Sequence, residues 1–262
     1  MSCSYLKYVY LFFQLNRSLT ILQVIPAFLG AMRSCPPNLQ EYYIQNLGHL
    51  IATVKQHIRK HLPPILALIS DFWTSGVTLQ VIIVDLIESI ATALEGEFKI
   101  YLPILLPLLL QAFEGDSTDR KTQTQLRILR AFGTFGANLE EYLHLTVPII
   151  VKTFERLDLP LAVRKAAITT LNVLCRKMNF TDHASRVVHP LVRILNSAPN
   201  ELKMAAVDTL CTLMTQIGPE FAIFIPLINK TLLRNRIQHA KYESLVSKLL
   251  RGESLPQDQG KL

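Results

Sequence analysis

ILLPLLLQAF (residues 104–113) is the stretch that decides the fold, because its pattern recurs along the chain. A few apolar residues precede a proline, and an amphipathic run follows it. Five other stretches repeat this pattern: QVIPAFLGAM (23–32), HLPPILALIS (61–70), LTVPIIVKTF (145–154), VVHPLVRIL (187–195) and IFIPLINKTL (223–232). Their shared feature is a proline, and successive prolines are separated by 38, 43, 41, 42 and 36 residues: Pro26, Pro64, Pro107, Pro148, Pro190 and Pro226. This near-constant period indicates a repeat protein.

The proline of each repeat predicts the start of a helix. Proline fits the first helical turn, where its missing N–H would have no partner and its fixed φ is already helical. Each of the six prolines is therefore predicted to open the second helix of a helix pair.

A first helix precedes most of these prolines, as apolar residues at helical spacing show. One such stripe is Leu79, Ile82, Ile83, Leu86, Ile87, Ile90 and Leu94, and a later one is Val207, Leu210, Cys211, Met214 and Ile217. A stripe of this kind covers one side of a helix, which must be buried against a neighbour. Since one pair cannot bury its own apolar face, the pairs are expected to stack.

The predicted fold is all-α, a HEAT-repeat αα superhelix (solenoid) of about six helix pairs. Two helices per repeat, with a proline inside the pair, favour HEAT over armadillo repeats. Three parts are expected along the chain. Residues 1–20 form an atypical N-terminal helix or extension, residues 21–251 form the solenoid, and residues 252–262 form a disordered tail or linker, because the apolar period ends there.

Charge is concentrated near the end of the repeats. The chain of 262 residues has a formal net charge of +7. Six basic residues, which we call the C-terminal basic cluster, accompany one acidic residue, Glu243, between residues 230 and 251: Lys230, Arg234, Arg236, Lys241, Lys248 and Arg251. The favoured interpretation is a solvated helix face, and the alternative is a surface for an anionic partner.

The cysteines and the apolar N-terminus bear on the compartment. Cys3, Cys35, Cys175 and Cys211 are too far apart for a CxxC pair and do not suggest a disulfide framework, so an intracellular location is expected. The apolar stretch from Tyr5 to Phe13 is too short to cross a bilayer and is interrupted by Lys7. No transmembrane segment is predicted.

Motifs for catalysis are missing from the sequence. There is no GxGxxG or GxxxxGK[ST] phosphate loop, no HExxH and no GxSxG. His57 and His61 have the spacing of a two-histidine metal pair, but basic residues surround them and no carboxylate follows, which disfavours a metal. Trp73, the single tryptophan, is expected to be a packing anchor. No catalytic residue, cofactor or metal is predicted.

Several strings are more specific than the repeat pattern: GEFKIYLPILLPLLLQAF (96–113), FGANLEEYLHLTVPIIVKTF (135–154), NFTDHASRVVHPLVRIL (179–195) and FAIFIPLINKTLLRNRIQHAKYE (221–243). They closely resemble the helical-repeat region of the target of rapamycin (TOR) serine/threonine protein kinases, which are related to phosphatidylinositol 3-kinases. The resemblance covers roughly residues 22–250; residues 1–20 do not share it. It implies helical repeats that form the arms of a dimer and bind adaptor subunits such as Raptor.

The leading functional hypothesis is a non-catalytic scaffold segment of a TOR-type kinase, acting in growth and nutrient signalling. The family's kinase domain is not in this sequence, so ATP and Mg²⁺ are expected only for that absent domain. The expected partners are another TOR protomer and a Raptor-like adaptor, with no small-molecule substrate and with nucleic acid disfavoured. The expected location is cytoplasmic, with peripheral contact to endomembranes or the lysosome through partners.

Two alternative functions remain open on the sequence. A HEAT-type transport receptor or phosphatase scaffold would share the fold but bind other proteins. Binding of nucleic acid or anionic lipid through the C-terminal basic cluster would give an affinity that falls steeply with salt.

Overall fold

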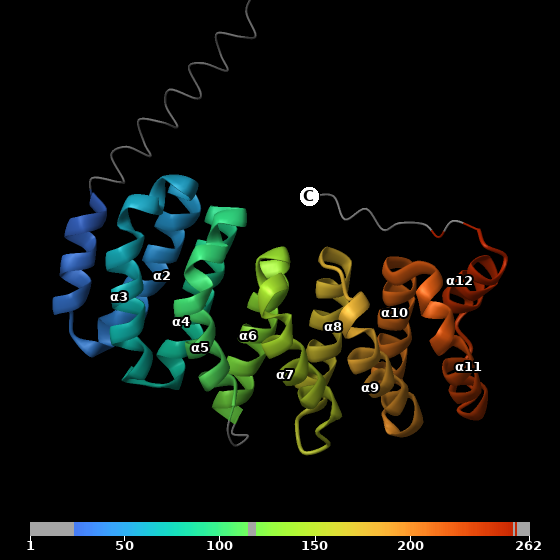
Figure 1. The fold of residues 1–262 in the computed structure, drawn as a ribbon. Coiled ribbons are helices and arrows are strands. Elements are labelled where there is room, and N and C mark those ends of the chain that lie inside the picture. The colour runs from blue at the N-terminus through green and yellow to red at the C-terminus, as the bar shows by residue number, and fades with distance from the viewer. Residues whose placement is uncertain (1–23, 115–118, 254, 256–262) are drawn as a thin grey trace, which may run out of the picture. The chain divides into compact units, whose positions relative to one another are not determined.

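The computed structural model describes residues 24–114, 119–253 and 255. Within these ranges every regular element is a helix, so the predicted helical-repeat class is confirmed (Figure 1). The predicted extension at 1–20 and most of the predicted tail lie outside the described residues. The chain forms two compact units, which meet in sequence between Phe135 and Gly136. The prediction of one continuous array over 21–251 stays a prediction.

The first unit consists of helix pairs in two layers. Its described elements are a helical segment Val24–Ser34, α2 (Pro37–Val54), η1 (Lys55–His61), α3 (Leu62–Phe72), η2 (Trp73–Ser75), α4 (Val77–Leu94), η3 (Glu95–Tyr101), α5 (Leu102–Phe113) and α6 (Asp119–Phe135). Helix α2 packs on α4, and α4 packs on α6, so these first helices form one layer. Helices α3 and α5 follow α2 and α4 as their second helices (Figure 1).

The second unit repeats this plan. Its elements are η4 (Gly136–Tyr142), α7 (Leu143–Glu155), α8 (Leu161–Lys177), η5 (Thr181–His183), α9 (Ala184–Ser197), α10 (Asn200–Ile217), η6 (Gly218–Phe224), α11 (Ile225–Arg234) and α12 (Ala240–Leu250). First helices α8, α10 and α12 pack in succession, while second helices α7, α9 and α11 form the other layer. Each of the six prolines lies in a second helix or in Val24–Ser34, as the sequence pattern predicts.

The prolines do not all open their helices, and this part of the prediction is wrong. Pro64 and Pro226 do lie in the first turns of α3 and α11. Pro107, Pro148 and Pro190 lie inside α5, α7 and α9 instead. The reason is that a 3₁₀ segment turns the chain after the first helix and continues directly into the second. The second helix therefore begins before these three prolines, which each leave the carbonyl four residues earlier without its usual helical donor.

A left-handed residue begins most of these 3₁₀ turns. The residue directly after α2, α4, α6 and α10 has a positive φ: 49° at Lys55, 52° at Glu95, 52° at Gly136 and 67° at Gly218. At Lys55 and Glu95 the ψ angles are −129° and −124°. This combination of positive φ and negative ψ is strongly disfavoured for residues that have a Cβ atom. Two repeats therefore use glycine for this turn, whereas two others carry backbone strain.

We expect Glu95→Gly to raise the free energy of unfolding by about 1 kcal/mol, because relief of the strained turn exceeds the added entropy of the unfolded chain. Chemical denaturation followed by circular dichroism measures the change. Glu95→Ala is the matched control: it removes the carboxylate but keeps a Cβ, so it should give no gain. Equal gains from both variants would assign the effect to the charge and contradict the strain.

Side chains also connect consecutive repeats. The first helix of one repeat donates a hydrogen bond to the end of the preceding second helix: Gln80 Nε2 to the Trp73 carbonyl at 3.0 Å, Gln125 Nε2 to Phe113 at 3.2 Å, and Arg164 Nε to Phe154 at 2.9 Å. Carbonyls at a helix C-terminus lack donors within the helix. These bonds satisfy one carbonyl each and fix how the next repeat follows.

The apolar stripes predicted from sequence form the core. Leu79, Ile83, Leu86, Ile87 and Ile90 are all at most 6% exposed. Trp73 is 5% exposed, which confirms it as a packing anchor. Cys175 and Cys211 are buried, and burial raises the pKa of both thiols, so they act as small hydrophobic residues, as predicted.

Candidate functional site

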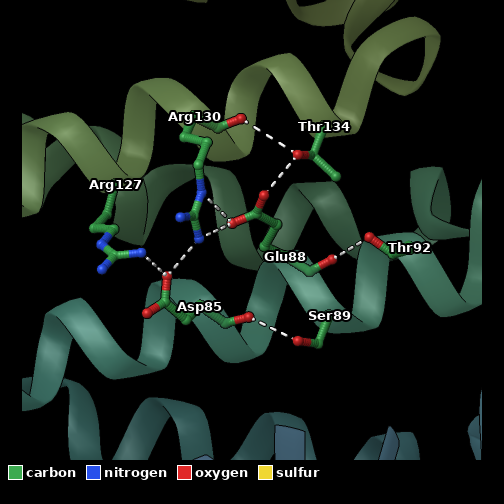
Figure 2. Close-up of polar contacts among 7 residues, drawn as sticks. All are labelled: Asp85, Glu88, Ser89, Thr92, Arg127, Arg130 and Thr134. Carbon is green, nitrogen blue, oxygen red and sulfur yellow. Dashed lines mark hydrogen bonds and ion pairs between the residues drawn. The ribbon is translucent and has the colours of Figure 1, made fainter. Parts of the chain in front are cut away.

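A charged network between α4 and α6 is the most organised polar feature of the first unit (Figure 2). The Arg130 guanidinium contacts Glu88 Oε2 through Nη2 at 2.6 Å and through Nε at 2.9 Å. The same Nη2 lies 2.9 Å from Asp85 Oδ1, which Arg127 Nη1 also approaches at 3.3 Å. Thr134 Oγ1 donates to Glu88 Oε1 at 2.7 Å. Glu88 therefore has donors on both carboxylate oxygens.

Helical spacing explains the network. Asp85 and Glu88 are three residues apart on α4, and Arg127 and Arg130 are three residues apart on α6. Residues at this spacing lie on the same face of a helix. Because α4 packs against α6, the acidic face meets the basic face one repeat later. The network thus stabilises the stacking of consecutive repeats.

Burial and charge act in opposite directions on Asp85. Burial raises the pKa of the Asp85 carboxyl above its usual value, and the attraction of Arg127 and Arg130 only partly offsets this. In contrast, the hydrogen bond to Glu88 is the main cause that raises the pKa of the Arg130 guanidinium. The Glu88–Arg130 contact is therefore the favourable centre of the network, and Asp85 is its least favourable member.

We expect Glu88→Gln to lower the free energy of unfolding at neutral pH by about 1–2 kcal/mol, because it weakens charge-assisted hydrogen bonds to a part-buried group. Asp85→Asn should leave stability no lower than that of the parent. The sign follows from the raised pKa: a carboxyl that holds its proton more tightly when folded disfavours folding once pH exceeds both pKa values.

Chemical denaturation of both variants tests this contrast. A pH series adds a second readout, because the stability difference between Asp85→Asn and the parent should shrink as the pH falls through the Asp85 pKa. If Asp85→Asn lowered the free energy of unfolding as much as Glu88→Gln does, the different contributions assigned to the two carboxylates would be wrong.

A groove adjoins the network. It has a volume of about 810 Å³ and is lined by the end of α2, the start of η1, the part of α4 from Asp85 to Ala93, Glu95 and Arg130. Its wall combines carboxylates with hydroxyl and amide groups, among them Thr53, Gln56 and Thr92. Within the described ranges, no group of three or more His, Cys, Asp or Glu side chains could hold a metal. The wall of the groove combines apolar residues, such as Val54 and Ala93, with these polar and charged groups.

The C-terminal basic cluster is distributed over two helices. Lys230 and Arg234 share one face of α11, Lys241 and Lys248 lie on α12, and Arg236 and Arg251 lie just after the two helices. Lys248 is part-buried and the other five residues are exposed. Arg251 lies 3.7 Å from Glu253. The exposure agrees with the interpretation as a solvated surface, and an anionic partner stays a prediction.

His57 and His61 do not form the geometry that their spacing suggested. Both lie in η1, a 3₁₀ segment with three residues per turn, so residues four apart point in different directions. His189, in α9, is exposed and contacts Phe224 edge-on.

Sequence reasoning missed the α4–α6 network. The available signal was a pair of carboxylates at i and i+3, followed 42 residues later by arginines at the same spacing, which matches the repeat length. Opposite charges one repeat apart indicate facing positions on stacked helices.

Comparisons with known proteins agree with this architecture. The fold and its stacked contacts define a helical-repeat protein without a recognisable catalytic constellation in its described part. A family model described as "Stalled ribosome sensor GCN1-like, HEAT repeats" matches residues 79–256, which is more than half of the chain. The chain belongs to this HEAT-repeat family.

The resemblance to TOR kinases is also confirmed. The chain is 43% identical over 236 residues to serine/threonine-protein kinase tor1 of Schizosaccharomyces pombe, covering 90% of the chain and 10% of that protein. It is 46% identical over 234 residues to TOR2 of Saccharomyces cerevisiae, covering 89% of the chain and 9% of that protein. For mTor of Drosophila melanogaster the identity is 39%, with shares of 92% and 10%. The chain therefore spans about one tenth of these relatives.

Solved structures show the same fold. The crystal structure of Kap121p aligns with a TM-score of 0.67 at 15% identity, covering 85% of this chain and 22% of that one. A designed armadillo repeat protein aligns with a TM-score of 0.57 at 14% identity, covering 86% and 98%. At these sequence identities the similarity shows the fold alone, so it does not support the alternative hypothesis of a transport receptor.

One described stretch, Asn200–Arg234, is long and apolar enough by composition to cross a membrane. In the structure it is the pair α10 and α11, separated by η6 and by the positive φ of Gly218. Some of its apolar residues, such as Leu210 and Ile228, are buried in the repeat core, whereas Ile223 and Leu233 are 75% and 79% exposed. The stretch is therefore two helices of the repeat array joined by a turn, not one continuous helix.

Proposed function

We propose that the chain is a non-catalytic scaffold segment of a TOR-type serine/threonine kinase, which binds a second kinase protomer and a Raptor-like adaptor subunit. The observation that supports this most is the 39–46% identity over about nine tenths of the chain to TOR kinases of three organisms. Stacked helical repeats commonly present extended surfaces to other proteins.

The groove beside the α4–α6 network is the proposed binding surface in the first unit. Glu88 and Arg130 hold each other in place, so the groove wall is ordered before a partner arrives. Preorganised polar groups lose less conformational entropy on binding. Exposed Thr53, Gln56 and Thr92 offer hydrogen-bonding groups along the wall.

In this proposal, catalysis belongs to a kinase domain elsewhere in the assembly, which would hold ATP and Mg²⁺. This chain would bind no small-molecule substrate, and nucleic acid would not be its partner. The segment would act in the cytoplasm and would reach endomembranes or the lysosome through its partners.

Co-precipitation of the tagged 262-residue chain from cells that contain a TOR-type kinase tests the proposal. We expect the kinase and a Raptor-like subunit to be recovered. The double variant Thr53→Arg/Thr92→Arg fills the groove with bulky charge and should reduce recovery at least fivefold.

Thr169→Arg is the matched control. Thr169, like Thr53 and Thr92, is an exposed threonine whose hydroxyl bonds the carbonyl four residues earlier, but it lies on α8, away from the groove. Recovery of neither subunit by the parent chain would reject the proposed function. Equal loss from Thr169→Arg would reject the groove as the surface.

A further inference from the structure

A second groove lies in the second unit, between the second helices α7 and α9. Its volume is about 580 Å³, and its lining comes from residues 147–156 and 185–193. The apolar part of the wall contains Val147, Val151 and the two internal prolines Pro148 and Pro190. Of these two prolines, Pro148 is exposed and Pro190 is buried.

The polar part of this α7–α9 groove is strongly basic. Five of its residues can carry a positive charge, against one carboxylate, Glu155: Lys152, Arg156, Arg186, His189 and Arg193. Helical spacing gathers them, because Arg186, His189 and Arg193 follow one another at three and four residues on α9. These three residues lie on one helix face. Lys152 lies in the last turn of α7, and Arg156 directly follows that helix.

Arg193 and Arg156 already form ion pairs, whereas Lys152 and Arg186 form none with the described residues. Arg193 contacts Glu155 Oε1 at 2.6 Å, and Arg156 contacts Asp158. In contrast, Lys152 and Arg186 are exposed, and no ion pair involves either of them among the residues that the structure describes. The groove thus retains positive charge on both of its walls.

We infer that the α7–α9 groove binds an acidic peptide segment of a protein partner, with carboxylates placed against Lys152 and Arg186. This inference rests on the proposed scaffold function and specifies the chemistry of one partner. Carboxylates fit the unpaired cations, and apolar side chains between them fit the exposed ring of Pro148 and the part-exposed Val151.

The lining favours a peptide over nucleic acid. Single-stranded nucleic acids are held by aromatic side chains on which bases stack, together with basic residues that follow the backbone. The only ring system in this groove other than proline is His189, which is edge-on to Phe224 at 6.0 Å.

Fluorescence anisotropy with the full 262-residue chain tests the inference. The probe is a labelled nonapeptide in which six acidic residues surround three leucines, and its counterpart carries lysines in place of the acidic residues. We expect the acidic peptide to bind and the lysine peptide not to bind. The double variant Lys152→Glu/Arg186→Glu should weaken binding at least tenfold.

Arg176→Glu/Lys203→Glu is the matched control, because it makes the same change of charge on α8 and α10 in the same unit, outside both the α7–α9 groove and the C-terminal basic cluster. It should change the affinity less than twofold. Circular dichroism establishes that both variants remain folded. Three results would each overturn the inference: equal weakening by the control, equal binding of the lysine peptide, or tighter binding of a single-stranded RNA that displaces the acidic peptide.

Failure of this inference and failure of the proposed function give different results. If the inference about the α7–α9 groove is wrong, the chain still recovers the kinase and adaptor from cells but does not bind the acidic peptide. If the proposed kinase association is wrong, the acidic peptide still binds and its binding still requires Lys152 and Arg186.

Discussion

Replacement of Phe98 by alanine should lower the free energy of unfolding by about 3–5 kcal/mol, the usual cost of a large cavity in a close-packed core. Phe98 lies in η3 and is fully buried. Its ring packs on Phe135 with centroids 4.8 Å apart, at an interplanar angle of 41°. The turn between α4 and α5 is thereby anchored to the end of α6.

Denaturant unfolding of Phe98→Ala measures this loss. Phe98→Leu retains most of the apolar volume and should lose less than half as much. Ile100→Ala, two residues away, is the matched control, because Ile100 is 70% exposed and its truncation should change stability by no more than about 0.5 kcal/mol. A loss below 1 kcal/mol for Phe98→Ala would contradict the packing described for η3.

Arg164→Ala should lower the free energy of unfolding by about 2–3 kcal/mol, because a charged donor and its apolar stem are lost together. Arg164 is 6% exposed, and its Nε donates to the Phe154 carbonyl at 2.9 Å. This carbonyl lies at the end of α7, where no helical donor is available. The guanidinium also places positive charge at the negative end of the helix dipole.

Lys165→Ala is the control for this prediction. Lys165 is the next residue on α8, and its ion pair with Glu201 at 2.9 Å is half-exposed. Exposed pairs of this kind contribute about 0–1 kcal/mol. Thermal and denaturant unfolding of the two variants should therefore differ clearly. Similar losses of unfolding free energy in both variants would show that the buried hydrogen bond of Arg164 contributes no more than the exposed ion pair of Lys165.

The helix pairs could be predicted from the sequence because both of their signals are local. The stripe from Leu79 to Leu94 fixes which face of α4 is buried, and that face is buried in the structure. The proline period identified the second helices correctly. It misplaced their starts at Pro107, Pro148 and Pro190, because apolar residues in a 3₁₀ turn and in the following helix look alike in sequence.

The candidate sites were harder to predict because they depend on which helix faces meet. Asp85 and Glu88 look like ordinary surface residues until α4 is placed beside α6. Arg164 looks like part of a solvated charge pattern, yet it is buried against the end of α7. The α7–α9 groove arises because the successive second helices α7 and α9 pack together and bring basic residues from both sides to the same space. Sequence spacing gives each face, but only the packing brings the faces together.

The spacing of the polar contacts between repeats has a kinetic consequence. Contacts such as Arg59–Glu97, Arg130–Glu88, Arg193–Glu155 and Thr212–Asn172 join residues that are 38, 42, 38 and 40 positions apart. Proteins dominated by such near-neighbour contacts close only short loops before they gain energy, and they fold quickly for their size. Each unit can therefore nucleate at any adjacent pair of repeats and grow outward, as it would on emerging from the ribosome, without waiting for distant sequence to be synthesised.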